Sequence, residues 1–94
     1  MKVRFTRAAK CELREAAQWY EASKPGLGLQ FKSAISRALA RLKQHPESGA
    51  LQPDDFRRAV VADFPYTLWY EVSENEILIH AVSHTKRKPS YWKN

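Results

Sequence analysis

Basic and aromatic side chains gather near the middle of the chain and again near its C-terminus. Arginine and lysine can stabilise the charge that develops on a phosphate group, whereas histidine and tyrosine can transfer protons. Aromatic rings can also stack on splayed RNA bases. Such a set fits metal-independent RNA cleavage, in which the 2′-OH attacks the neighbouring phosphate. Its members are Arg57, Arg58, His84, Lys86, Arg87, Lys88, Tyr91 and Trp92.

Each member of this set has a possible role in that chemistry. Proton transfer falls to His84 and Tyr91, and charge stabilisation falls to Arg57, Arg58 and Arg87. Arg57 and Arg58 are adjacent on a predicted strand, so their side chains point to opposite faces and only one can line a shared site. Two alternatives stay open: the same groups bind an acidic protein surface without chemistry, or the aromatic tail packs on the core.

Other site chemistries do not fit the spacing of the residues. His80 and His84 lie on or just after a predicted strand, where four residues separate their Cα atoms by ~13 Å, too far to chelate one ion. Cys11 has no sequence cue for an activating histidine. The chain also lacks a glycine-rich phosphate loop and a pair of carboxylates placed for acid–base work. We therefore expect neither a metal nor a cofactor.

Length and composition predict one globular domain, residues 1–94. Hydrophobic residues make up 44% of the chain and charged residues 28%, proportions that argue against intrinsic disorder. A single cysteine excludes an intramolecular disulfide and fits a reducing compartment. The sequence shows neither a signal peptide nor an apolar stretch of ~20 residues. We expect a cytoplasmic protein that does not enter a membrane.

Hydrophobic periodicity divides the chain into six elements. Val3 and Phe5 alternate with charged residues, which predicts a short strand ending at Thr6, a residue that can cap the following helix. The predicted elements are strand 2–6, helices 8–22 and 29–44, and strands 56–64, 66–72 and 76–82. The order β-α-α-β-β-β predicts an α+β fold, with an antiparallel helical hairpin packed on a mostly antiparallel four-stranded sheet.

The net charge of +6 is unevenly distributed along the chain. Residues 1–10, 31–44 and 83–94 each carry four basic side chains and no acidic one. The remaining segments hold four basic and ten acidic residues, a sum of −6. This clustering favours a polyanionic or acidic partner over a charge that serves solubility alone.

The last two predicted strands carry large apolar side chains on both faces. On strand 66–72, Trp69 faces away from Leu68 and Tyr70. On strand 76–82, simple alternation places Ile77, Ile79 and Ala81 on one face, and Leu78, His80 and Val82 on the other. Because a helical hairpin covers only one face, we expect either the C-terminal tail or a partner to cover the second.

Four segments follow one another in a characteristic order and spacing. They are MKVRFTRAAKCELREAAQWYEA, LGLQFKSAISRALARLKQHPESG, FRRAVVADFPYTLWYEV and ILIHAVSHTKRKPSYW. The last contains an H-x-x-R-x-P-x-Y-W ending that runs from His84 to Trp92. In this order the segments resemble the first strand and helix, the second helix, the central hairpin and the final strand of the RelE/ParE superfamily of bacterial toxins. These toxins belong to type II toxin–antitoxin modules, and the resemblance covers essentially the whole chain.

The resemblance implies a fold, a partner and two alternative targets. The fold is β-α-α-β-β-β, and the partner is a cognate antitoxin that wraps an amphipathic, often acidic segment around the toxin. RelE-like members cut messenger RNA in the ribosomal A site, using lysines and arginines on the central strands and a C-terminal arginine and tyrosine. ParE-like members inhibit DNA gyrase and are not nucleases.

The residues of this chain match the two branches unequally. The positions that match the RelE-like nuclease residues are Arg57 or Arg58, Arg87 and Tyr91. However, the chain has no lysine between Lys43 and Lys86, so the lysines of the central strands are missing. The ending that begins at His84 is common among ParE-like and plasmid-stabilisation members. The resemblance therefore favours the ParE-like branch.

We thus expect a type II toxin that is neutralised by an antitoxin and that inhibits DNA gyrase. The first alternative is a ribosome-dependent mRNA endoribonuclease, the only one of these activities that would make the chain an enzyme. The second is a degenerate toxin that keeps only antitoxin binding. The residues expected to bind the target or the antitoxin are Arg58, Trp69, Leu78, Lys86, Arg87, Lys88 and Trp92.

Overall fold

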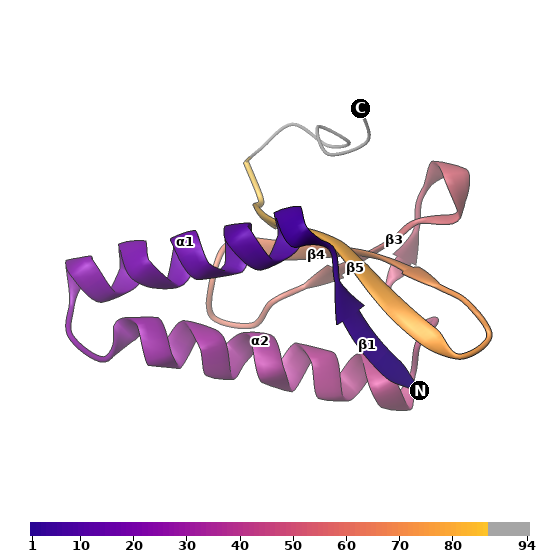
Figure 1. Ribbon diagram of the computed structural model, residues 1–94, viewed down its shortest axis with the longest axis horizontal. Coiled ribbons are helices and arrows are strands. Elements are labelled where there is room, and N and C mark those ends of the chain that lie inside the picture. Colours follow the sequence, from indigo (N-terminus) through magenta and orange to yellow (C-terminus); the bar gives the residue numbers. More distant parts are fainter. Residues whose placement is uncertain (87–94) are drawn as a thin grey trace.

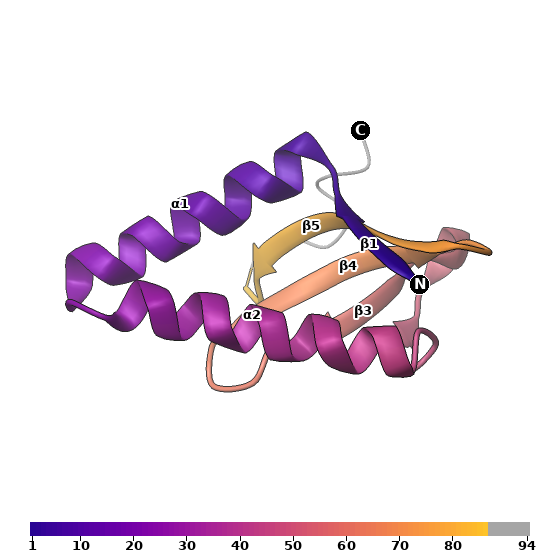
Figure 2. The same ribbon diagram turned by 60° about the horizontal axis from the view of Figure 1, so that its bottom comes forward.

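The computed structural model describes residues 1–86, in which two helices cover one face of a β-sheet (Figures 1 and 2). The elements are β1 (Lys2–Phe5), α1 (Arg7–Ser23), α2 (Leu27–Gln44), β2 (Ala50–Leu51), the 3-10 turn η1 (Pro53–Asp55), β3 (Arg57–Val60), β4 (Tyr66–Val72) and β5 (Glu76–His84). The predicted α+β fold, with a helical hairpin on a mostly antiparallel sheet, is therefore confirmed.

The sheet of the described residues has five strands in the order β1-β5-β4-β3-β2, one more than the four predicted. β1 runs parallel to β5, and the other neighbours are antiparallel. The additional strand, β2, is only two residues long and pairs Ala50 with Arg58 and Leu51 with Arg57. Two residues are too few for a hydrophobic alternation, so β2 had no signal in the sequence.

Two of the predicted strand boundaries were wrong by more than one residue. β3 ends at Val60 instead of residue 64, because the chain turns between β3 and β4: Asp63 has φ 71° and the Tyr66 N–H donates to the Phe64 carbonyl. β5 continues to His84, two residues beyond the predicted end. The turn predicted at residues 73–75 is present between β4 and β5.

The two helices begin through different capping contacts. The Thr6 hydroxyl accepts a hydrogen bond from the Ala9 N–H at 3.1 Å, which confirms the predicted N-cap of α1. α2 begins at Leu27, two residues before the predicted start, after Gly26 with φ 90°. A Cβ on Gly28 would lie 2.7 Å from the Ala17 carbonyl oxygen, so glycine allows the two helices to approach closely there.

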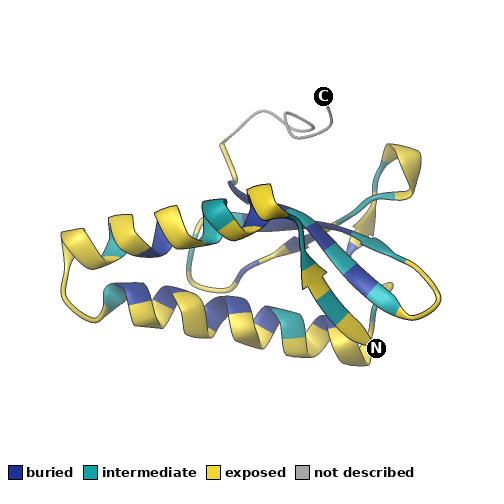
Figure 3. Cartoon of the chain, viewed as in Figure 1, coloured by how far each residue is buried: buried dark blue, intermediate teal, exposed yellow. Residues whose placement is uncertain are grey.

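The hydrophobic core lies between the helices and the sheet. Buried positions recur on the inner sides of both helices and along the central strands (Figure 3). The largest side chains that are fully buried are Tyr70, Phe31, Leu42, Leu68, Ile77, Ile79 and Val61. The rings of Tyr20, Phe64 and Tyr66 pack around Phe31 at centroid distances of 5.0–5.2 Å. These aromatic contacts pack the helical hairpin against one end of the sheet.

A bulge in β5 changes which side chains face the helices. Tyr70 pairs with Ile79 but Trp69 pairs with Ala81, so His80 is the extra residue. After the bulge the alternation is reversed: Val82 packs into the core with Leu68, and Ala81 joins Trp69 on the other face. The prediction that Ala81 shares a face with Ile79, and Val82 with Leu78, was therefore wrong.

Candidate functional site

The face of the sheet that is turned away from the helices carries most of the described residues that were expected to bind a target. We call it the distal face and define it by Arg58, Trp69, Glu71 and Leu78. Directly paired residues lie on the same face of a sheet, and Arg58 pairs with Trp69 and Glu71 with Leu78. Their neighbours in β4, by contrast, point into the core between sheet and helices.

Arg58 and Trp69 form a cation–π pair on the distal face. The Arg58 guanidinium carbon lies 5.9 Å from the centre of the Trp69 ring. The indole N–H of Trp69 donates to the Ser83 hydroxyl at 3.2 Å, and the tryptophan is 6% exposed. Arg58 itself is exposed. A positioned ring therefore supports a cation whose N–H groups remain accessible to a ligand.

Arg57 lies on the opposite face and contacts the loop that follows α2. Its guanidinium donates to the carbonyl of Glu47 at 3.0 Å and to that of Gly49 at 2.9 Å. The paired residue, Tyr70, donates its hydroxyl to the Pro46 carbonyl at 2.8 Å and accepts from the Gly49 N–H at 3.0 Å. Arg57 and Tyr70 thus both hold this loop in place. Burial also raises the pKa of the Tyr70 hydroxyl.

His84 lies on the face of the sheet that packs against the helices, opposite to the face that carries Arg58. It pairs with Tyr66, whose ring centre is 5.5 Å from the imidazole, and its Nδ1 accepts from the Lys86 N–H at 3.1 Å. Together with Glu12 and Trp19 of α1 it lines a hollow of ≈ 350 Å³. Arg58 and His84 therefore face opposite sides of the sheet.

The proposed nuclease set is thus divided within residues 1–86. Arg57 contacts loop carbonyls, Arg58 lies on the distal face, and His84 lies beside α1. Lys86 lies just beyond the end of β5 and is exposed, and the other four members lie outside the described residues: Arg87, Lys88, Tyr91 and Trp92. The expectation that the tail could cover the second face of the sheet falls outside them too.

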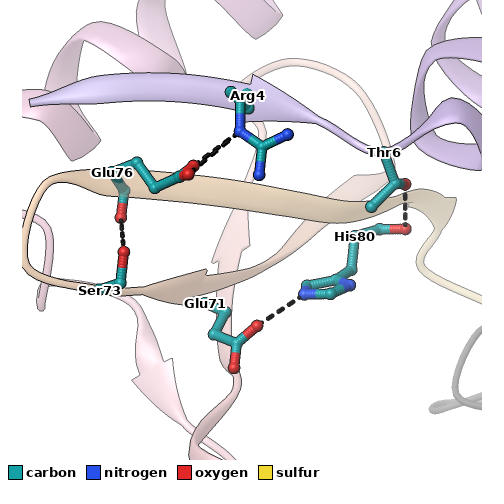
Figure 4. A network of polar contacts seen from close by, with 6 residues as sticks. All are labelled: Arg4, Thr6, Glu71, Ser73, Glu76 and His80. Carbon is teal, nitrogen blue, oxygen red and sulfur yellow. Dashed lines mark hydrogen bonds and ion pairs between the residues drawn. The ribbon is translucent and has the colours of Figure 1, made fainter.

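Polar contacts cross the sheet near the bulge in β5 (Figure 4). The Nε2 atom of His80 lies 2.9 Å from a Glu71 carboxylate oxygen, and the Phe56 ring packs edge-on against the imidazole at 5.0 Å. At the other end of β5, Arg4 donates to Glu76 at 2.7 Å, and this hydrogen bond lowers the pKa of the Glu76 carboxyl. His80 is half-buried.

Residues 1–86 contain no group of three or more histidine, cysteine, aspartate or glutamate side chains that could hold a metal ion. Neither helix in that part of the chain is long and apolar enough to cross a membrane. Sequence reasoning missed one contact of the hairpin, the capping of α2 by Glu21 of α1.

The protein is a two-layer α+β domain whose candidate basic residues lie on both faces of the sheet. Comparison with known proteins assigns it to a family. Residues 3–89 match the model of the ParE toxins of type II toxin–antitoxin systems, parDE. The chain belongs to this family, and thus to the RelE/ParE superfamily of toxins.

A solved structure described as the chromosomal ParDE TA system from P. aeruginosa has a similar fold. Its TM-score to this chain is 0.75 at 23% sequence identity, and the alignment covers 89% of this chain and 95% of that one. At this identity the likeness supports the fold alone. No curated protein matches this chain significantly.

Proposed function

We propose that this toxin inhibits DNA gyrase and is held inactive by a cognate antitoxin. The observation that carries the proposal is the division of the nuclease candidates between two faces of the sheet. Phosphoryl transfer needs its base and its cations within hydrogen-bond reach of one phosphate. Arg58 and His84 face opposite sides of the sheet, and Arg57 donates to two loop carbonyls.

The absence of lysines from the central strands also favours a gyrase inhibitor over a nuclease. Members that cut mRNA are expected to carry lysines on the central strands, and this chain has none between Lys43 and Lys86. Without them, fewer cations are available to stabilise a phosphorane in the transition state. A toxin that acts by binding does not need such an arrangement.

The distal face is the proposed target-binding surface. Arg58 offers an accessible guanidinium that the buried Trp69 ring supports, and the half-buried Leu78 supplies apolar area on the same face. Arginine and tryptophan are the residue types that most often dominate the binding energy of protein interfaces. The other residues proposed to bind the target or the antitoxin are Lys86 and, outside the described residues, Arg87, Lys88 and Trp92.

The antitoxin is proposed to be an acidic, amphipathic segment, because the chain carries +6 and clusters its basic residues. An antitoxin peptide that binds only the folded toxin raises its melting temperature. Its affinity should fall as salt increases, because exposed charges supply part of the attraction. An affinity that does not change with salt would contradict this electrostatic part.

The target is tested by inducing the chain in bacteria and mapping mRNA 5′ ends within minutes. We expect growth arrest with intact messages, and inhibition of supercoiling when purified toxin is added to gyrase. Cuts at a fixed position within codons would instead establish the ribosome-dependent nuclease. In that case Arg87→Ala and Tyr91→Phe should abolish cleavage while antitoxin binding survives. Absence of arrest in a host whose gyrase the purified toxin also fails to inhibit would favour the degenerate toxin.

A further inference from the structure

The helical hairpin presents a basic surface that is separate from the distal face. On α1, Arg7, Lys10 and Arg14 follow one another at spacings of three and four residues, so they share one side of the helix. On α2, Lys32 and Lys43 are eleven residues apart, about three turns, and also share a side. All five side chains are exposed. We call them the basic helical surface.

One cation from each helix lines a groove between α1 and α2. Arg14 and Lys32 both line a hollow of ≈ 350 Å³, together with Gln18 of α1 and Gly28 of α2. The helices run alongside each other in Figure 1, and Figure 2 shows that they lie closest near the hairpin turn and diverge toward the start of α1. Arg14 and Lys32 are therefore placed to contact the same ligand from two sides.

The cations of the basic helical surface form no ion pairs with the described residues of the toxin. Within residues 1–86, the ion pairs involve Arg4, Arg37 and His80, and none of the five cations of the basic helical surface. The acid in the groove, Glu21, accepts hydrogen bonds from the backbone N–H groups of Gly26 and Gly28. Its carboxylate is thus held by backbone donors near the N-terminus of α2.

The composition of the surface favours a phosphate backbone over a protein partner. Protein interfaces have an apolar core, with arginine and aromatic residues enriched and lysine depleted. Here Leu29, which is 70% exposed, is the one large exposed hydrophobic residue lining the groove in the described part of the chain. Nucleic-acid interfaces are more polar and far more positive, because each lysine or arginine can neutralise a phosphate and release a counterion.

We propose that the basic helical surface binds the phosphate backbone of duplex DNA without reading its sequence. The toxin would then bring its own affinity for DNA to a target or complex that also holds DNA. The inference concerns a different surface from the proposed target-binding face, and it holds whichever target that face binds.

The test is the binding of purified full-length toxin to a fluorescent random-sequence DNA duplex, measured by anisotropy over a series of salt concentrations without gyrase. The double variant Arg14→Gln/Lys32→Gln removes two cations from the groove. The matched control, Lys2→Gln/Arg37→Gln, removes two exposed cations elsewhere: Lys2 on the sheet beside Glu76, and Arg37 beside Asp63. Both variants lower the formal net charge from +6 by two, to +4.

We expect the wild-type affinity to fall steeply with salt, with a logarithmic slope of about −0.9 per phosphate contact. The groove variant should lose about two contacts, so that its slope becomes shallower by roughly 1.8. The control should keep nearly the wild-type slope. Thermal melts of both variants confirm that they are folded.

Three outcomes would overturn the proposal. One is equal weakening by both variants, which would assign the binding to net charge alone. Another is no salt-dependent binding of wild type at low salt. The third is tighter binding of an acidic peptide than of DNA, with the same dependence on Arg14 and Lys32, which would make the groove a protein site. Gyrase inhibition is scored separately, so either proposal can fail while the other stands.

Discussion

The Glu21 carboxylate, near the end of α1, accepts a hydrogen bond at 3.0 Å from the Gly28 backbone N–H in the first turn of α2. It also accepts from the Gly26 N–H, at 3.0 and 3.1 Å to its two oxygens. The first N–H groups of a helix have no partner within the helix, and Gly26, the N-cap, has no side chain to serve them. One helix thus caps the next and fixes the tight turn of the hairpin.

Glu21→Ala should destabilise the toxin by about 1 kcal/mol, the usual effect of losing an N-cap side chain. For a domain of this size the melting temperature should fall by roughly 4–8 °C. The matched control is Glu15→Ala, which removes an exposed carboxylate from the same helix away from the turn. Equal melting temperatures for the two variants would show that the cap contributes nothing.

Tyr70→Phe should destabilise the fold by about 1–3 kcal/mol, because it leaves the Gly49 N–H and the Pro46 carbonyl without their buried partner. Urea denaturation at neutral pH measures the loss. Tyr66→Phe is the control, since the structure gives the Tyr66 hydroxyl no hydrogen bond within the described residues, and its effect should stay below about 0.5 kcal/mol. A smaller loss for Tyr70→Phe than for the control would contradict the role of the hydroxyl.

Stability should decline at alkaline pH through the buried and half-buried tyrosines. Burial raises the pKa of the Tyr20, Tyr66 and Tyr70 hydroxyls above the ordinary value of 10.0. Above pH 10 the unfolded chain loses these protons first, so the free energy of unfolding falls as the pH rises toward the folded-state pKa values. Denaturation curves between pH 8 and pH 11 test this, and Tyr66→Phe should show a shallower decline than wild type. Identical slopes would exclude a contribution from Tyr66.

Arg57→Ala and Arg58→Ala should separate stability from toxicity. Removing Arg57 deletes two hydrogen bonds to the loop after α2, which should cost about 1–2 kcal/mol of stability. Removing Arg58 deletes one exposed cation–π contact, which should cost no more than about 1 kcal/mol. Arg58→Ala should nevertheless relieve growth arrest and gyrase inhibition.

Thermal melts and induction assays on the two variants check this pair of predictions. Full toxicity of Arg58→Ala, at wild-type expression, would remove Arg58 from the target-binding surface. If Arg58→Ala lost mRNA cleavage instead of gyrase inhibition, Arg58 would be assigned to a nuclease site.

The sequence alone predicted the elements whose signals are local. Thr6 was expected to cap α1, and its hydroxyl does so, because an N-cap contact involves residues three apart in the chain. Adjacent arginines on a strand were expected to point to opposite faces, and Arg57 and Arg58 do. Apolar periodicity likewise indicated both helices and the strands β3, β4 and β5, although the ends of β3 and β5 differed.

The tertiary structure decided the features that join distant segments. The bulge at His80 moves Val82 into the core, because the pairing of β4 with β5 sets the register and simple alternation cannot reveal an extra residue. Glu21 caps α2 only because the hairpin folds back on itself. Strand register likewise places His84 and Arg58 on opposite sides of the sheet. The residue types in a sequence suggest a chemistry, but only strand register and helix packing determine which side chains meet.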